Sequence, residues 1–241
     1  MMDKKETIIA MIPARIGSTR LPKKNLALIN GEPLISYAVN AAKASGVFDR
    51  IVINADDPVF EKIALRYGVE FYYRPENLGS STTKSDDVVL DFMKNHPADI
   101  VCWVNPTSPL QTGEEIQKVV RHFQNKGLDS LITTMDQQVH ANFSNTPLNY
   151  KTDELFAQTQ DLTPVELFVY SVMMWRTRPF VQAYEAQNHA FFVGKVGFYP
   201  VSKLSAVIIK RKEDLKLAES ILKSMAKNSD AVEYDPLVKD I

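Results

Sequence analysis

The first 135 residues alternate between short apolar runs and helical patterns, and this alternation limits the folds open to the chain. The apolar runs lack the polar alternation of a half-exposed strand and cover residues 7–12, 50–54, 70–73, 100–104 and 130–134. The helical patterns cover residues 34–45, 59–67, 85–95 and 114–125, and each is closely followed by a Gly or Pro that can end a helix. Strands buried on both faces and joined by helices form a parallel sheet. The sequence therefore predicts an α/β fold with a mostly parallel sheet and helices on both faces.

Residues 136–190 interrupt this alternation. They are rich in Gln, Asn and Thr and carry aromatic side chains that we interpret as exposed, namely Phe143, Tyr150, Phe156, Phe168, Tyr170 and Trp175. A segment of this length that cannot bury itself is typical of a functional or partner surface. We expect it to be a dimerisation or acceptor-side arm inserted into a single domain of residues 1–241, which makes the protein a homodimer. Strands at 191–199 and 206–209 and a helix at 212–226 complete the predicted fold.

The loop after the first apolar run has the composition of a phosphate-binding site. It reads Ala-Arg-Ile-Gly-Ser-Thr-Arg-Leu-Pro-Lys-Lys-Asn over residues 14–25. Its Gly-Ser-Thr turn can direct backbone N–H groups toward an anion, and its two Arg and two Lys supply positive charge. From charge alone, a solvated basic turn explains the loop equally well. The order and spacing of the residues favour the phosphate site.

Three loops follow predicted strands, at residues 13–25, 54–58 and 105–111. Ligands of parallel sheets bind in the crevice outside the carboxyl ends of the strands. We therefore expect the three loops to converge on one crevice that binds a nucleotide.

Net charge and cysteine content narrow the classes of function. The formal charge is −1, whereas general nucleic-acid binders carry a strong basic excess, so we expect no nucleic-acid partner. No apolar run reaches the roughly 20 residues that a membrane-spanning helix needs, and no signal-peptide core follows the first six residues. We expect a cytoplasmic protein with no membrane partner. Cys102, the only cysteine, lies in an apolar run and is expected to be a buried structural thiol.

Several motifs in order resemble those of one enzyme family. The pattern Ala-Arg-x-Gly-Ser-x-Arg-x-Pro-x-Lys-Asn at 14–25 is followed by Gly-Glu-Pro-Leu-Ile-Ser-Tyr at 31–37, Arg-Pro-Glu-Asn-Leu at 74–78 and Pro-Thr-Ser-Pro-Leu at 106–110. Together they resemble the acylneuraminate cytidylyltransferases and the related 3-deoxy-manno-octulosonate enzymes. The resemblance implies a Rossmann-like nucleotidyltransferase fold, CTP as substrate and an acidic sugar as acceptor.

The resemblance also implies roles for individual residues. Arg15, Ser18, Lys24 and Asn25 match first-loop residues that hold the triphosphate and assist the departure of pyrophosphate. Negative charge grows on the bridging oxygen during such a transfer and calls for nearby cations, so Arg15, Lys24 and Lys210 are the candidate catalytic residues. The candidate substrate-binding residues are Ala14, Gly17, Ser18, Arg20, Asn25, Arg74, Ser81, Thr82, Asn105, Gln111 and Gln160.

The segment before the last predicted helix departs from the family pattern. The family usually carries two Asp metal ligands there, and the matching residues are Ile208 and Lys210. Three accounts stay open. The Lys210 ammonium supplies the charge that Mg²⁺ would bring; Mg²⁺ binds through substrate phosphates and another carboxylate such as Asp56 or Asp57; or the protein does not catalyse.

The acceptor side departs from the family as well. Asn105 and Gln111 stand where the family has Gln and Arg around the Pro-Thr-Ser-Pro-Leu motif, and no Asn-Gly-Ala motif follows Pro164. We expect transfer of CMP from CTP to a small acidic acceptor, either an acidic sugar or a related compound. The alternative is a catalytically weakened or inactive homologue that binds nucleotide or a partner as a regulator or scaffold.

Overall fold

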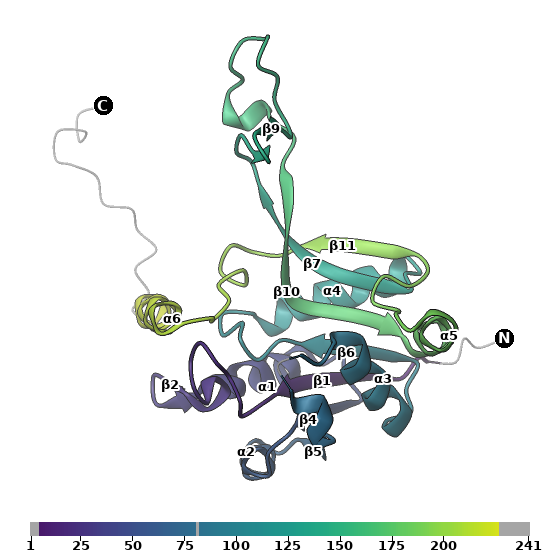
Figure 1. Cartoon of the computed structure of the whole chain (residues 1–241). Coiled ribbons are helices and arrows are strands. Elements are labelled where there is room, and N and C mark those ends of the chain that lie inside the picture. Colours follow the sequence, from purple (N-terminus) through teal and green to yellow (C-terminus); the bar gives the residue numbers. More distant parts are fainter. Residues whose placement is uncertain (1–4, 81, 227–241) are drawn as a thin grey trace.

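The apolar runs form a seven-stranded sheet in the computed structural model, which describes residues 5–80 and 82–226 (Figure 1). The strand order is β11-β7-β10-β6-β1-β4-β5. All neighbouring strands are parallel except β10, which runs antiparallel to both β6 and β7. The mostly parallel sheet is therefore confirmed. Its strands are β1 (Ile8–Ala14), β4 (Arg50–Ala55), β5 (Glu70–Tyr73), β6 (Ile100–Val104), β7 (Ser130–Gln137), β10 (Val165–Arg176) and β11 (Val196–Pro200).

Helices cover both faces of the sheet. Successive residues of β1 point to opposite faces, so Ala10 and Ile12 pack in one apolar cluster and Ile9 and Met11 in another. The first cluster includes α1 (Leu34–Ser45), α2 (Val59–Tyr67) and α4 (Gly113–Asn125), and the second α3 (Ser85–Asn95) and α5 (Thr177–Gln187). In the described residues, every helix is too short or too polar to cross a membrane.

Two glycines end helices as the sequence predicts. Gly46 and Gly68 follow α1 and α2 with φ of 64° and 61°, the left-handed conformation that a side chain rarely adopts. The bounds of α1, α2 and α3 are those predicted. Cys102 is fully buried in β6, and burial raises the pKa of its thiol.

The prediction that residues 136–190 form one exposed insertion is wrong. The second half of β10 lies inside the sheet, and Trp175 is 0% exposed, with its indole N–H donating to the Phe191 carbonyl at 2.8 Å. The aromatic content of the segment therefore reflects core packing at this end. What projects from the body is the arm, residues 138–164 between β7 and β10, with β8 (Asn142–Phe143), β9 (Thr146–Pro147) and the 3₁₀ turn η3 (Thr159–Asp161) (Figure 1).

The side-chain amide of Asn149 ties the two sides of the arm together. The Asn149 side chain accepts the Ala141 N–H at 3.0 Å and donates to the carbonyls of Val139 and Thr163, both at 2.9 Å. Large apolar side chains stay on its outside: Leu155 is 97% exposed and Phe143 71%.

Two predicted strands at the end of the chain are also corrected. The strand predicted at 191–199 begins only at Val196, and residues 206–209 form no strand. Ile209 instead donates its N–H to the Thr107 carbonyl at 2.8 Å and buries its side chain with Ala218. This apolar run therefore serves packing against α6 (Lys212–Met225), which also contacts β2 (Leu28–Ile29) of the small β2-β3 (Glu32–Pro33) hairpin.

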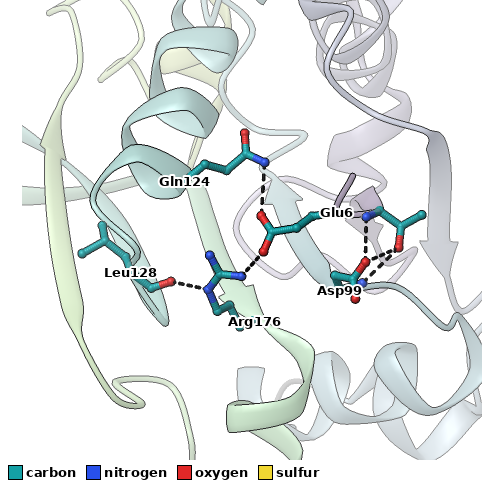
Figure 2. Close-up of polar contacts among 6 residues, drawn as sticks. Glu6, Asp99, Gln124, Leu128 and Arg176 are labelled. Atoms are coloured by element: carbon teal, nitrogen blue, oxygen red, sulfur yellow. Dashed lines mark hydrogen bonds and ion pairs between the residues drawn. The ribbon is translucent and has the colours of Figure 1, made fainter. Parts of the chain in front are cut away.

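A polar network joins β10 to the amino ends of the parallel strands (Figure 2). The Glu6 carboxylate accepts from Arg176 and, at 3.3 Å, from Gln124. The Nε of Arg176 donates to the Leu128 carbonyl at 2.9 Å, which links β10 to the residues before β7. Beside it, Asp99 accepts the Thr7 N–H at 2.8 Å. The network lies at the end of the sheet opposite to the one where the loops after β1 and β6 emerge.

Replacing Trp175 tests whether the second half of β10 belongs to the core. Trp175→Ala should lower the free energy of unfolding by about 3–5 kcal/mol, the cost of emptying a large buried aromatic site. Leu65→Ala, at a residue 82% exposed on α2, should change it by less than about 0.5 kcal/mol. Denaturant unfolding monitored by circular dichroism measures both, and equal small effects would contradict the placement of Trp175.

Candidate functional site

A cleft of about 300 Å³ lies outside the carboxyl ends of β1 and β6. Its walls come from the loop after β1, the residues between β5 and α3, the end of β6 and the residues before α6. Among the described residues, no Asp or Glu lines it. The cationic side chains that line it are Arg15, Arg20, Lys24, Arg74, Lys84 and Lys210.

The loop after β1 is anchored from behind. The Ile16 N–H donates to Asp56 Oδ1 at 2.9 Å, and the Ser18 N–H donates to the Ile16 carbonyl at 3.0 Å. The Ser18 N–H, expected to face an anion, therefore stabilises the loop itself. Lys23 then adopts a φ of 51° and turns the chain into the 3₁₀ turn η1 (Lys24–Leu26). This turn brings Lys24 and Asn25 back to the cleft.

Arg74 forms a buried wall of the cleft. Its side chain is only 4% exposed, and its Nη2 donates to the Ala14 carbonyl at 2.9 Å. Burial lowers the pKa of its guanidinium, against the raising effect of Asp56 and Asp91. Its Nε has no hydrogen-bond partner among the residues described. A buried cation with an unmet donor is costly unless a ligand oxygen accepts from it.

Lys24 lies in a strongly positive environment. Its Nζ donates to the Ile209 carbonyl at 3.0 Å, which joins the first loop to the segment before α6. Burial lowers the pKa of its ammonium, and the charges of Arg20 and Arg15 lower it further. A polyanion in the cleft would relieve this repulsion.

Two more buried polar atoms meet the cleft without a protein partner. They are Asn25 Oδ1 and the indole nitrogen of Trp103, within the described part of the chain. The sequence analysis did not select Trp103. A signal for Trp103 existed, because it carries the one indole of an otherwise apolar strand and lies two residues before Asn105.

Most candidate residues meet at the cleft. Gly17 and Thr82 lie in the neighbouring loops without lining it, and Ser81 lies outside the described residues. The candidates that line the cleft are Ala14, Arg15, Ser18, Arg20, Lys24, Asn25, Arg74, Asn105 and Lys210.

Two candidate glutamines lie elsewhere. Gln111 is buried and donates its amide to Glu115 at 2.6 Å, in the first turn of α4. Gln160 is exposed on η3 of the arm, which projects from the body (Figure 1). Neither side chain lines the cleft of this chain, because Gln111 is hydrogen-bonded to Glu115 and Gln160 lies on the projecting arm.

Asn105 shapes the cleft wall through its side-chain amide. Its Oδ1 accepts the Thr107 N–H at 3.0 Å and the Thr107 hydroxyl at 2.8 Å, and its Nδ2 donates to the Tyr170 carbonyl at 3.0 Å. Tyr170 has a φ of 59° at a bulge in β10, a strained conformation for a Tyr. Asn105 therefore stabilises the β10 bulge beside the cleft.

Asp56 and Asp57 do not reach the cleft, contrary to the expectation for loop 54–58. Asp56 holds Ile16 from behind, and Asp57 Oδ1 accepts the Val59 N–H at 2.8 Å at the start of α2. Within residues 5–80 and 82–226, no three His, Cys, Asp or Glu side chains form a group that could hold a metal ion. The side chains of the cleft therefore do not fit a protein-held Mg²⁺, which prefers carboxylate oxygens.

Comparison with known proteins finds relatives of this chain. A family model described as cytidylyltransferase matches residues 9–235. The pseudaminic acid cytidylyltransferase of Campylobacter jejuni subsp. jejuni serotype O:2 is 30% identical over 167 residues, which are 64% of this chain and 72% of that protein. The N-acylneuraminate cytidylyltransferase of Streptococcus agalactiae serotype V is 24% identical over 215 residues. That match covers 86% of this chain and 51% of the streptococcal protein, so the chain spans about half its length.

Solved structures share the fold at lower identity. A CMP:2-keto-3-deoxy-manno-octonic acid synthetase complexed with CTP superposes with a TM-score of 0.69 at 15% identity, covering 91% of this chain and 99% of that one. A cytidylyltransferase from Leptospira borgpetersenii serovar Hardjo-bovis gives a TM-score of 0.60 at 16% identity, covering 96% and 100%. At these identities the likeness concerns the fold alone.

The lowered pKa of Lys24 predicts that polyanion binding takes up protons in alkaline solution. Below the lowered pKa of the free protein, Lys24 is charged in both states and no uptake occurs; above it, a bound polyanion raises the pKa and restores the proton. Titration calorimetry of inorganic tripolyphosphate, in buffers of different ionisation enthalpy, measures this uptake as the pH is raised toward 10.5, the ordinary pKa of a lysine. Lys24→Arg should abolish it, because Arg stays charged, and the exposed control Lys203→Arg should keep it. Uptake that persists in Lys24→Arg would refute the assignment.

Proposed function

The chain belongs to the cytidylyltransferase family, and we propose on that premise that it transfers CMP from CTP to a small acidic acceptor, releasing pyrophosphate. The observation that carries the proposal is the cleft itself, in which the six cationic side chains meet at the carboxyl ends of β1 and β6. A triphosphate is the ligand that such a cleft accommodates, because its charge offsets the repulsion among these groups.

The proposed reaction uses these side chains to stabilise the leaving group. An acceptor hydroxyl attacks the α-phosphorus and releases its proton to solvent as the new P–O bond forms. The bond from the α-phosphorus to the bridging oxygen breaks, and its electron pair stays on pyrophosphate. Arg15 and Lys24 hold the phosphates on which charge accumulates. Arg74 donates its unpaired Nε–H to an oxygen of the nucleotide deeper in the cleft. Arg74 and Lys24 are already held by the carbonyls of Ala14 and Ile209, so these two cations need little reorganisation during the reaction.

The acceptor is proposed to be an acidic sugar or a related acidic compound. Two matched relatives are named for pseudaminic acid and N-acylneuraminate, and one structural neighbour for 2-keto-3-deoxy-manno-octonic acid. All three are acidic sugars. The cationic cleft is consistent with a carboxylate near the nucleotide.

A second candidate function follows from one departure in sequence. Ile208 and Lys210 stand where the family pattern has two Asp, so the chain is alternatively a weakened or inactive homologue that binds nucleotide as a regulator. The two candidates differ in one measurable property, the release of pyrophosphate.

Pyrophosphate release with each of the four nucleoside triphosphates, against a panel of acidic sugars, tests the proposal. Release is expected only with CTP and an acidic acceptor. Arg15→Ala should weaken CTP binding by about 1.5–3 kcal/mol, the range for a charge-assisted hydrogen bond, while the exposed control Arg121→Ala binds as wild type. CTP binding without any release would favour the regulator, and wild-type affinity in Arg15→Ala would reject the phosphate site.

We propose further that the arm forms a homodimer. Leu155 and Phe143 are large apolar side chains that stay exposed on a projecting segment. A two-fold contact between copies of the arm is the commonest way to cover such a surface, and a stable one buries about 1,200–2,000 Å².

Light scattering tests this assembly at micromolar concentration. The wild type is expected at twice the 27.2 kDa mass of the chain. The double variant Leu155→Asp with Phe143→Asp should give a monomer, because it places charges in the contact. Leu65→Asp, which alters a residue 82% exposed on α2, should stay dimeric. A wild-type particle of 27.2 kDa would contradict the proposal.

A further inference from the structure

The cleft has an unusual charge balance for a chain with net charge −1. All the ionised side chains that line it, among the described residues, are cations. Nucleotide sites that hold Mg²⁺ usually supply one or two carboxylates for it. The charge that a divalent ion would bring is already present in the walls.

Two carboxylates whose charges act on Lys24 and Arg74 are committed to backbone groups. Asp214 Oδ2 accepts the N–H groups of Lys210 and Arg211 at 2.8 Å and 2.7 Å, which caps the start of α6. Asp56 holds the first loop through Ile16, and its side chain fills the space beside Gly79, where an added Cβ would lie 2.5 Å from Asp56 Oδ2. Moving either carboxylate to a metal would release a helix start or the loop.

Lys210 is positioned by its neighbours. Ile209 donates its N–H to the Thr107 carbonyl at 2.8 Å and accepts from Lys24 Nζ at 3.0 Å, so the residue before Lys210 is fixed on both sides. Lys210 is exposed and lines the cleft. Its charge acts on Lys24, which shows that the two ammonium groups share one electrostatic environment. The two ammonium groups therefore offer two positive charges to a polyanion in the cleft.

We infer that Lys210, together with Lys24, neutralises a bound polyphosphate in place of a protein-held divalent cation, so that nucleoside triphosphates bind this cleft without Mg²⁺. The choice of a nucleoside triphosphate as the ligand rests on the proposed function. The role of Lys210 and Lys24 does not, because it applies to any polyphosphate. The inference also accounts for Lys210 at a position where the family pattern has a carboxylate: a cation there attracts the phosphates directly.

Calorimetric titration with CTP and with inorganic tripolyphosphate, in EDTA and in Mg²⁺ at equal ionic strength, tests the inference. The wild type should bind both ligands in EDTA, and Mg²⁺ should not tighten the binding. Lys210→Ala should weaken binding in EDTA by about tenfold to a hundredfold, the equivalent of one charge-assisted hydrogen bond. Lys210→Asp should weaken it further and recover in Mg²⁺, because it restores a ligand for a hard cation.

The control is Lys203→Asp, which makes the same charge change at an exposed residue that does not line the cleft. It should bind as wild type in EDTA. Wild-type binding that requires Mg²⁺, or unchanged binding in Lys210→Ala, overturns the inference while leaving the proposed transfer intact. Metal-free, Lys210-dependent binding of tripolyphosphate without any binding of CTP supports the inference and rejects CTP as substrate. Binding of neither ligand in EDTA overturns it.

Discussion

The antiparallel insertion of β10 between β6 and β7 is the constraint on which most of this structure depends. Because β10 runs against its neighbours, its first half pairs with the end of β7, beyond the residues that pair with β6, and carries the arm away from the body (Figure 1). Its second half buries Trp175 and ends at Arg176, which is clamped by Glu6 and Leu128 (Figure 2). The bulge between the two halves lies beside the cleft, and Asn105 holds its strained Tyr170 through the backbone. One strand thus joins the core, the arm and the wall of the site.

The cleft concentrates positive charge at a cost to the free protein. Arg74 and Lys24 are withdrawn from water, and both have lowered pKa values because burial penalises their charged forms. No ion pair in the described residues joins either side chain to a carboxylate. Such arrangements are kept where a ligand supplies the missing charge, so this energetic cost is itself a sign of function. The anchoring of the first loop by Asp56 keeps that loop in place although its cations repel one another.

The site is assembled from segments that are far apart in the chain. Lys24 and Ile209 are 185 residues apart and share a hydrogen bond, and Thr107, in the loop after β6, accepts a hydrogen bond from the same segment. Glu115 adds a further tie, since it accepts from Gln111 at 2.6 Å and from the Ser202 N–H at 2.6 Å. The segment that carries Lys210 is therefore held by α4, by the end of β6 and by the first loop at once. This explains how a run of apolar residues without a strand partner reaches a defined position.

The sequence by itself determined the local elements and the first loop. The spacing of apolar residues and the stop at Gly46 or Gly68 are short-range signals, so α1 and α2 have their predicted bounds, and the position of the basic loop after β1 follows from chain order. Only the tertiary structure decided which polar side chains face the cleft. Gln111 and Asp56 are committed to distant partners, and Trp103 acquires its place from the strands beside it. Trp175 is in the core because β10 pairs with β6 and β7 across long stretches of chain, and no local pattern encodes that pairing.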